Sequence, residues 1–246
     1  MPGNVTRTAA VALALGALAY TAWALEVLLV TGLDPVRGYV SELAAGDQPF
    51  GGFFRAADRT AGFLVLVGAL AGLLATLRRR AAPPPPPGVP SWARRPGRAA
   101  GTPWFAAGWA ALAVFGAATV ADSWLPLSCA PTADPACAAR EAAGSVPATH
   151  AAHAVSSGLA TTAAVTAMIL LTAAARRHGR WGTLARTGAA LLALELAATA
   201  WTLAAVTAFE AGAGNWALGL AQRLQVLLVA LWLAVLARAL HRERRP

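Results

Sequence analysis

Six runs of apolar residues, each close to the length that crosses a lipid bilayer, constrain this chain more than any other feature. A bilayer core needs about 20 mostly apolar residues in a helix. None of the six runs shows the two-residue alternation of a membrane β-strand, and a lone segment in lipid can satisfy its backbone polar groups only as a helix. The runs cover residues 8–30, 60–77, 103–121, 149–175, 187–209 and 216–237.

Composition agrees with this interpretation, because 57% of the 246 residues are hydrophobic and only 13% are charged, against about 25% charged in a soluble domain. The predicted fold class is therefore all-α. We expect residues 1–246 to form a single transmembrane domain, a polytopic bundle of six transmembrane helices whose main partner is the lipid bilayer.

All 20 basic residues are arginines, and they are distributed unevenly between the two ends of the predicted helices. The positive-inside rule then places both termini in the cytoplasm of a plasma-membrane protein. An Arg- and Pro-rich loop, residues 78–102 with five prolines at 83–87, is also predicted to be cytoplasmic, whereas residues 32–59, 122–148 and 210–215 lie outside. We attribute the net charge of +9 to this topology and to contact with anionic lipid, and expect no nucleic-acid partner.

Cys129 and Cys137 are the only cysteines, and both fall in the predicted extracytoplasmic loop 122–148. An oxidising exterior permits a disulfide between them. Closing so short a loop stabilises a fold by about 2–3 kcal/mol on the chain-entropy model. A pair of free thiols or a metal-binding pair is the alternative.

Polar and charged residues gather at the predicted outer ends of several helices. Charged groups near hydrocarbon normally face a bundle interior, a partner or water, so we expect Arg223 in the sixth helix to pair with Asp58 or Asp122. Glu42 is expected to be a solvated loop residue or a lid contact. Glu195, in the middle of the fifth helix, is either functional or hydrogen-bonded to a neighbouring helix. The cluster comprises Ser41, Glu42, Asp58, Asp122, His150, His153, Ser157 and Arg223.

His150 and His153 lie three residues apart, so both imidazoles can address one small site from a single helix. A catalytic zinc needs a third protein ligand and an open position for water. Asp58 or Asp122 would supply the ligand or the base, and a metal-bound water would be the nucleophile. The competing interpretation is a structural hydrogen-bond network that includes Arg223, Glu42 and Ser157, and ligand sensing or transport is a third.

Four stretches carry a resemblance to a known family: YVSELAA at 39–45, RAAD at 55–58, DSWLPLSCAPTADPAC at 122–137 and HAAHAVSS at 150–157. Together they resemble the bacterial integral membrane family catalogued as domain of unknown function nine-nine-eight. This resemblance implies a multi-helix membrane protein with an extracytoplasmic polar cluster, and the family name conveys no reaction.

A looser similarity is to membrane hydrolases that include the alkaline ceramidases and the progestin/adiponectin-type receptors. It implies a Ser, an Asp and histidines around a metal, roles that Ser41, Asp58 or Asp122, His150 and His153 would take. The chain differs from that pattern in having six predicted helices rather than seven and no third outer histidine. The sequence thus predicts a structural or sensory membrane protein, with a metal-dependent hydrolase of a lipid or envelope substrate as the alternative.

Overall fold

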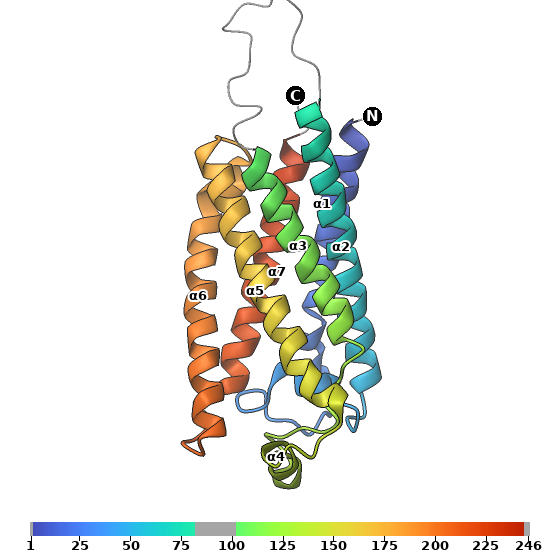
Figure 1. Cartoon of the computed structure of the whole chain (residues 1–246), viewed down its shortest axis with the longest axis vertical. Helices are drawn as coiled ribbons and strands as arrows, with labels where there is room; N and C mark the ends of the chain where they lie inside the picture. Colours follow the sequence, from blue (N-terminus) through green and yellow to red (C-terminus); the bar gives the residue numbers. More distant parts are fainter. Residues whose placement is uncertain (1, 82–101, 244–246) are drawn as a thin grey trace, which may run out of the picture.

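The computed structural model describes residues 2–81 and 102–243, and this part of the chain contains helices and no strand (Figure 1). Six of the helices are long, and a short one, α4, lies in the connection between α3 and α5. Two 3-10 helices, η1 and η2, follow α1. The bounds are α1 Pro2–Tyr20, η1 Ala22–Leu28, η2 Val40–Ala44, α2 Gly51–Ala81, α3 Thr102–Asp122, α4 Pro135–Ala142, α5 Ala148–Arg177, α6 Gly182–Glu210 and α7 Leu218–Arg242.

The six long helices form a closed ring in chain order. Each helix packs against its neighbours in the sequence, and α1 packs against α7 to complete the circle (Figure 1). One end of the ring carries residues 29–50, 123–147 and 211–217, and we call it the disulfide end because Cys129 and Cys137 lie in the second of these segments. The other is the arginine end, where α2 finishes in Arg78, Arg79 and Arg80. The described chain begins and ends at the arginine end, as an even number of crossings requires.

The prediction of six membrane helices is confirmed, because six helices are long and apolar enough to cross a bilayer. The chain is therefore a multi-pass membrane protein. The cytoplasmic placement of the arginine end stays a prediction from the positive-inside rule. The five prolines at 83–87 lie outside the described residues.

Several helix boundaries differ from the prediction by five residues or more, and two of these differences are the largest. The first α-helix ends at Tyr20, and the rest of its apolar run continues as the 3-10 helix η1 instead of reaching residue 30 as one α-helix. The second helix begins at Gly51 instead of residue 60. Its first turns are polar, so hydropathy registers only the apolar part that follows them.

Small residues let α2 and α3 approach closely, as is typical of helices packed in membranes. A Cβ atom on Gly116 would lie 2.6 Å from the backbone nitrogen of Leu66, and one on Gly62 would lie 2.8 Å from the Gly116 carbonyl oxygen. Large buried side chains such as Trp109 and Trp232 belong to the hydrophobic core. The polar lining of the candidate site lies nearer the disulfide end of the same ring.

Candidate functional site

A cavity of about 150 Å³ lies inside the ring towards the disulfide end. It is closed in part by η2, which contributes Val40 and Ser41, and its other walls come from α1, η1, α2, α3, α5, α6 and α7. The lining residues are Tyr20, Trp23, Val40, Ser41, Asp58, Phe115, Thr119, Asp122, Ser157, Ala160, Thr161, Ala164, Glu195, Gln222, Gln225, Val226 and Val229.

The charged groups of this lining are all acidic. Asp58, Asp122 and Glu195 line the cavity, and no arginine or histidine is among the residues that do. Asp58 makes no hydrogen bond or ion pair with any residue that the structure describes. Glu195 is fully buried, with Oε1 accepting a hydrogen bond from Thr199 at 3.3 Å. Its Oε2 has no hydrogen-bond partner among the described residues.

Aromatic and amide groups complete the lining. Tyr20 and Phe115 meet edge to face, with ring centroids 5.5 Å apart. The indole nitrogen Nε1 of Trp23 is buried and lacks a hydrogen-bond partner within residues 2–81 and 102–243. Gln225 donates a hydrogen bond from Nε2 to Thr199 Oγ1 at 3.0 Å. The cavity therefore holds buried donors and acceptors that the described residues do not satisfy, which is uncommon in a folded interior.

Asp122 and Ser157, which line the cavity, form a hydrogen-bonded group with His153, which is not among the lining residues. His153 Nδ1 lies 3.2 Å from Asp122 Oδ1 and 3.0 Å from the Leu125 carbonyl oxygen. His153 Nε2 lies 3.3 Å from Ser157 Oγ, and this hydroxyl lies 3.0 Å from Asp122 Oδ1. The Ser156 hydroxyl also donates to Asp122 Oδ1. The sequence placed these residues at the ends of two helices, and the fold brings them into contact.

The partners of His153 determine which ring nitrogen carries the proton. A backbone carbonyl oxygen can only accept a hydrogen bond, so Nδ1 must donate to Leu125. In the neutral imidazole Nε2 is then unprotonated, and its lone pair faces Ser157.

His150 has the opposite arrangement. Its Nδ1 accepts a hydrogen bond from the Ser128 backbone N–H at 3.0 Å, so Nε2 carries the proton in the neutral ring. Nε2 lies 3.5 Å from Glu141 Oε1, outside the cavity. His150 and His153 thus contact different partners. Zinc ligation by the two stays a prediction, and no three His, Cys, Asp or Glu side chains of the described chain are grouped to hold a metal ion.

The prediction that Arg223 pairs with Asp58 or Asp122 is wrong, because its partner is Glu26 in η1. Nε and Nη2 of Arg223 donate to the two carboxylate oxygens of Glu26, both at 2.6 Å. Nη1 donates to the carbonyl oxygens of Gly38 and Gly219, at 2.9 and 3.1 Å. The acidic residue near the end of the first apolar run was the available signal. Only the packing of α1 against α7 brings η1, which follows α1 in the chain, close enough for Glu26 to be the partner.

Glu42 is not a solvated residue as expected, because it is fully buried under the loop between α3 and α5. Its two oxygens accept from the Thr132 backbone N–H at 2.7 Å and from the Thr132 hydroxyl at 2.5 Å. Burial raises the pKa of this carboxyl group, and the bonds from Thr132 oppose that rise. A lid contact, the second expectation for this residue, describes it better. We call residues 123–147 the lid, because Glu42 joins this segment to η2, which lines the cavity.

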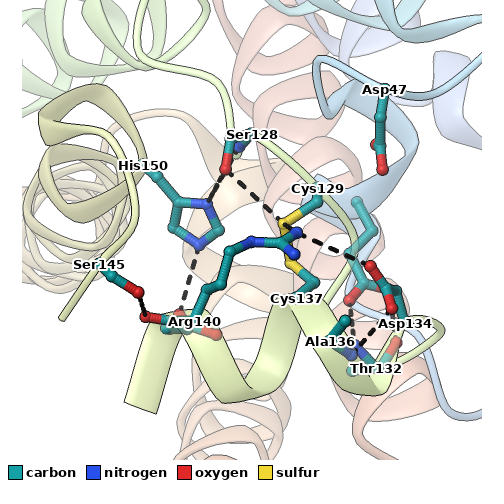
Figure 2. The surroundings of a disulfide bond; sticks show 12 residues. Asp47, Ser128, Cys129, Thr132, Asp134, Ala136, Cys137, Arg140, Ser145 and His150 are labelled. Atoms are coloured by element: carbon teal, nitrogen blue, oxygen red, sulfur yellow. Dashed lines mark hydrogen bonds and ion pairs between the residues drawn. A yellow bond between two sulfur atoms is a disulfide. The ribbon is translucent and has the colours of Figure 1, made fainter. Parts of the chain in front are cut away.

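The predicted disulfide is present, and it joins Cys129 and Cys137 within the lid (Figure 2). Asp134 caps the N-terminus of α4 by accepting from the Ala136 backbone N–H at 2.9 Å. Arg140, on the last turn of α4, reaches back so that Nη2 lies 3.4 Å from the Cys129 sulfur. The lid is therefore a compact cross-linked unit, and Ser128 attaches it to α5 through His150.

Four of the eight residues of the predicted cluster line the cavity, and the other four do not. Ser41, Asp58, Asp122 and Ser157 line it, whereas Glu42, His150 and Arg223 connect the surrounding elements. The sequence missed Trp23 and Tyr20 as lining residues, since nothing in an apolar run distinguishes a cavity-facing aromatic side chain from a core one.

A family model described as "Protein of unknown function (DUF998)" matches residues 13–89 and 91–239, nearly the whole chain. No curated protein and no solved structure matches the chain.

Proposed function

The chain belongs to the DUF998 family, and we propose that it is a membrane receptor that binds a small organic ammonium ion in the cavity between its helices. This proposal follows the sensory interpretation of the sequence. The observation that carries it is the lining of the cavity, which contains three carboxyl groups and no arginine or histidine. Asp122 contacts His153, whereas Asp58 and Glu195 form no ion pair with any described residue.

Charge decides the class of ligand. Burying a carboxylate away from water costs free energy unless a cation or hydrogen-bond donors compensate it, and ionisable groups within membrane helices usually mark a functional site. Gln222 and Gln225 of α7 line the cavity, and Arg223 is the basic residue nearest to them in the sequence. Its guanidinium group is already paired with the carboxylate of Glu26. The unpaired Oε2 of Glu195 and the free carboxyl group of Asp58 are therefore available to a ligand cation.

The shape and the aromatic lining favour an organic ammonium ion over a metal ion. Tyr20, Trp23 and Phe115 line the cavity beside the carboxyl groups, and aromatic faces attract quaternary and other ammonium cations. The volume of about 150 Å³ resembles that of an engineered cavity that holds one benzene molecule. An ammonium head group with a few carbon atoms fits these dimensions.

The lid gives the ligand a route that agrees with the predicted topology. Ser41 in η2 lines the cavity, and the next residue, Glu42, is bonded to Thr132 of the lid. If the disulfide end faces outward, a ligand from outside the cell reaches the cavity past η2. Its binding would then be transmitted to the lid through the Glu42–Thr132 contact, as a sensory role requires.

Calorimetry on the purified protein in lipid nanodiscs tests this function. Choline is titrated in parallel with 3,3-dimethylbutanol, which has the same shape and no charge. We expect choline to bind and the uncharged alcohol to bind at least about tenfold more weakly, since one charge–carboxylate contact at 4 Å is worth about 4 kcal/mol at an effective dielectric of 20.

Two variants of α6 make the test specific. Glu195→Gln replaces the buried carboxyl group of the cavity wall with an amide that cannot become a carboxylate, and we expect it to weaken choline binding at least tenfold. Glu210→Gln is the matched control, because Glu210 ends the same helix and is exposed. Equal binding of choline and the alcohol, or equal effects of the two variants, would refute the proposal.

A further inference from the structure

We infer that Ser157 is a nucleophile that cleaves a carboxylic ester in the cavity, with His153 as its general base and Asp122 as a positioning residue. The inference rests on the proposed function for its substrate class, a small ester that carries an ammonium group. The geometry that carries it is the contact of the hydroxyl of Ser157, a lining residue of the cavity, with the unprotonated ring nitrogen of His153.

The proton positions fit this role. A serine hydroxyl is a weak nucleophile until an adjacent base accepts its proton. His153 Nε2 is that base, because the carbonyl oxygen of Leu125 and the carboxylate of Asp122 both require the ring proton on Nδ1. Ser157 Oγ lies 3.3 Å from Nε2 and 3.0 Å from Asp122 Oδ1. Rotation of the hydroxyl alone moves its proton from the carboxylate to the imidazole.

Asp122 acts through His153. The negative charge next to Nδ1 stabilises the imidazolium that forms when Nε2 takes a proton, and it keeps the ring in the productive orientation. The same division of roles between nucleophile, base and carboxylate occurs on unrelated folds and is recognised by geometry. Ser156 donates to the same Asp122 oxygen, which helps to hold the carboxyl group in place.

The cavity supplies the other parts of such a site. Trp23 Nε1 is a buried donor that lines the cavity and lacks a partner among the described residues. Donors of this kind stabilise the oxyanion of a tetrahedral intermediate. Asp58 and Glu195 would bind the ammonium group of the substrate, as in the proposed receptor function. Substrate binding and bond cleavage would thus use different residues of one lining.

The reaction balances with water as the one co-reactant. Ser157 Oγ forms a bond to the ester carbonyl carbon while its proton passes to His153 Nε2. Collapse of the tetrahedral intermediate breaks the bond to the leaving alcohol, which takes that proton and departs. Water then attacks the acyl-serine and gives a proton to His153. The second collapse returns this proton to Ser157 Oγ and releases the carboxylic acid.

A fluorophosphonate probe tests the nucleophile directly, because it phosphonylates activated serine hydroxyls. The full-length protein in nanodiscs is treated with the probe, and the adduct is located by mass spectrometry. We expect the adduct on Ser157, its loss in Ser157→Ala, and a decrease of at least about a hundredfold in labelling rate in His153→Gln, the lower range of general-base effects. Asp122→Glu should recover part of the labelling that Asp122→Asn loses.

The chain offers a matched control in Ser128, which contacts His150 at 2.9 Å but lies in the lid and not at the cavity. Ser128→Ala should label as the wild type does. Hydrolysis of acetylcholine, compared with that of 3,3-dimethylbutyl acetate, then tests the substrate class, and we expect the choline ester to be cleaved at least tenfold faster.

The outcomes separate the two proposals. Wild-type protein that binds choline and gives no adduct on Ser157 would overturn the catalytic inference and leave the receptor function intact. An adduct on Ser157 with equal cleavage of both esters would overturn the ammonium substrate class. An adduct on Ser128 or Ser41 in place of Ser157 would overturn the assignment of the nucleophile.

Discussion

Replacing Glu26 by glutamine should strongly destabilise the protein, because it leaves Arg223 buried without a counter-charge. Glu26 is 8% exposed and Arg223 is 6% exposed. All four hydrogen bonds of the guanidinium group go to buried acceptors, two on Glu26 and one each on Gly38 and Gly219. The pair joins η1 to α7 and to the segment before η2.

The size of the effect follows from this geometry. Hydrogen bonds to charged groups contribute about 1.5–3 kcal/mol each, and two of them join the guanidinium to the carboxylate. Removing one member of a buried pair costs about 3–5 kcal/mol, since the other charge is left uncompensated. Glutamine keeps one acceptor oxygen, so we expect Glu26→Gln to lower the free energy of unfolding by about 3 kcal/mol, the lower part of that range.

Unfolding in mixed micelles of dodecylmaltoside and SDS, followed by tryptophan fluorescence, measures this change. Arg223→Met should be similarly destabilising. The double variant buries no unpaired charge, so its loss of unfolding free energy should be smaller than the sum of the losses in the two single variants, by a coupling of about 2 kcal/mol. Asp34→Asn is the control, since the Asp34–Arg37 pair is exposed and such pairs contribute about 0–1 kcal/mol. Additive single effects, or a loss below 1 kcal/mol in Glu26→Gln, would refute the reasoning.

The remaining predictions concern the lid and the helix packing. Reduction of the Cys129–Cys137 disulfide opens a loop with a sequence separation of 8, so it should lower the free energy of unfolding by about 2.5 kcal/mol on the chain-entropy model. Dithiothreitol should therefore lower the Tm of the wild type and leave the Tm of the variant with both cysteines replaced by serine unchanged. Burial raises the pKa of Glu42, so the folded state binds its proton more tightly than the unfolded state does. The free energy of unfolding should be greatest below the ordinary pKa of a glutamate and should fall as the pH rises from that value towards the raised pKa of the folded state. Unfolding of the Glu42→Gln variant, measured as a function of pH, should lack this decrease. Gly116→Ala should lower the free energy of unfolding by about 1–3 kcal/mol, because the added Cβ atom would meet the backbone of α2. Gly158→Ala has open space around it, so in the same unfolding assay it should be neutral or stabilise the protein by up to about 1 kcal/mol. Equal melting temperatures for the two variants would contradict the close contact between α2 and α3.

The helices could be predicted because lipid imposes a simple rule on composition and length. Each of the six apolar runs corresponds to a long helix, and the family resemblance carried by four short motifs is confirmed over nearly the whole chain. The boundaries were harder to predict. The polar first turns of α2 and the change from α-helix to 3-10 helix after Tyr20 depend on contacts with neighbouring elements, which hydropathy does not report.

The candidate site was predicted as a set of residue types at one membrane level, and the structure sorted this set into separate groups. Asp122 and Ser157 meet around His153, Asp58 and Ser41 line the same cavity, and Glu42 is buried under the lid. His150 and His153 share a helix but hold their protons on opposite nitrogens, because each ring meets a different backbone group. Spacing along a helix could not reveal that difference.

The sequence by itself determined the membrane location, the number of crossings and the loop that holds the disulfide, because all three follow from composition and from residues close together in the chain. Only the tertiary structure decided that Arg223 belongs to Glu26 and that three acidic side chains surround one cavity. These relations join residues on different helices, so they depend on how the ring closes and on which face each helix turns inward.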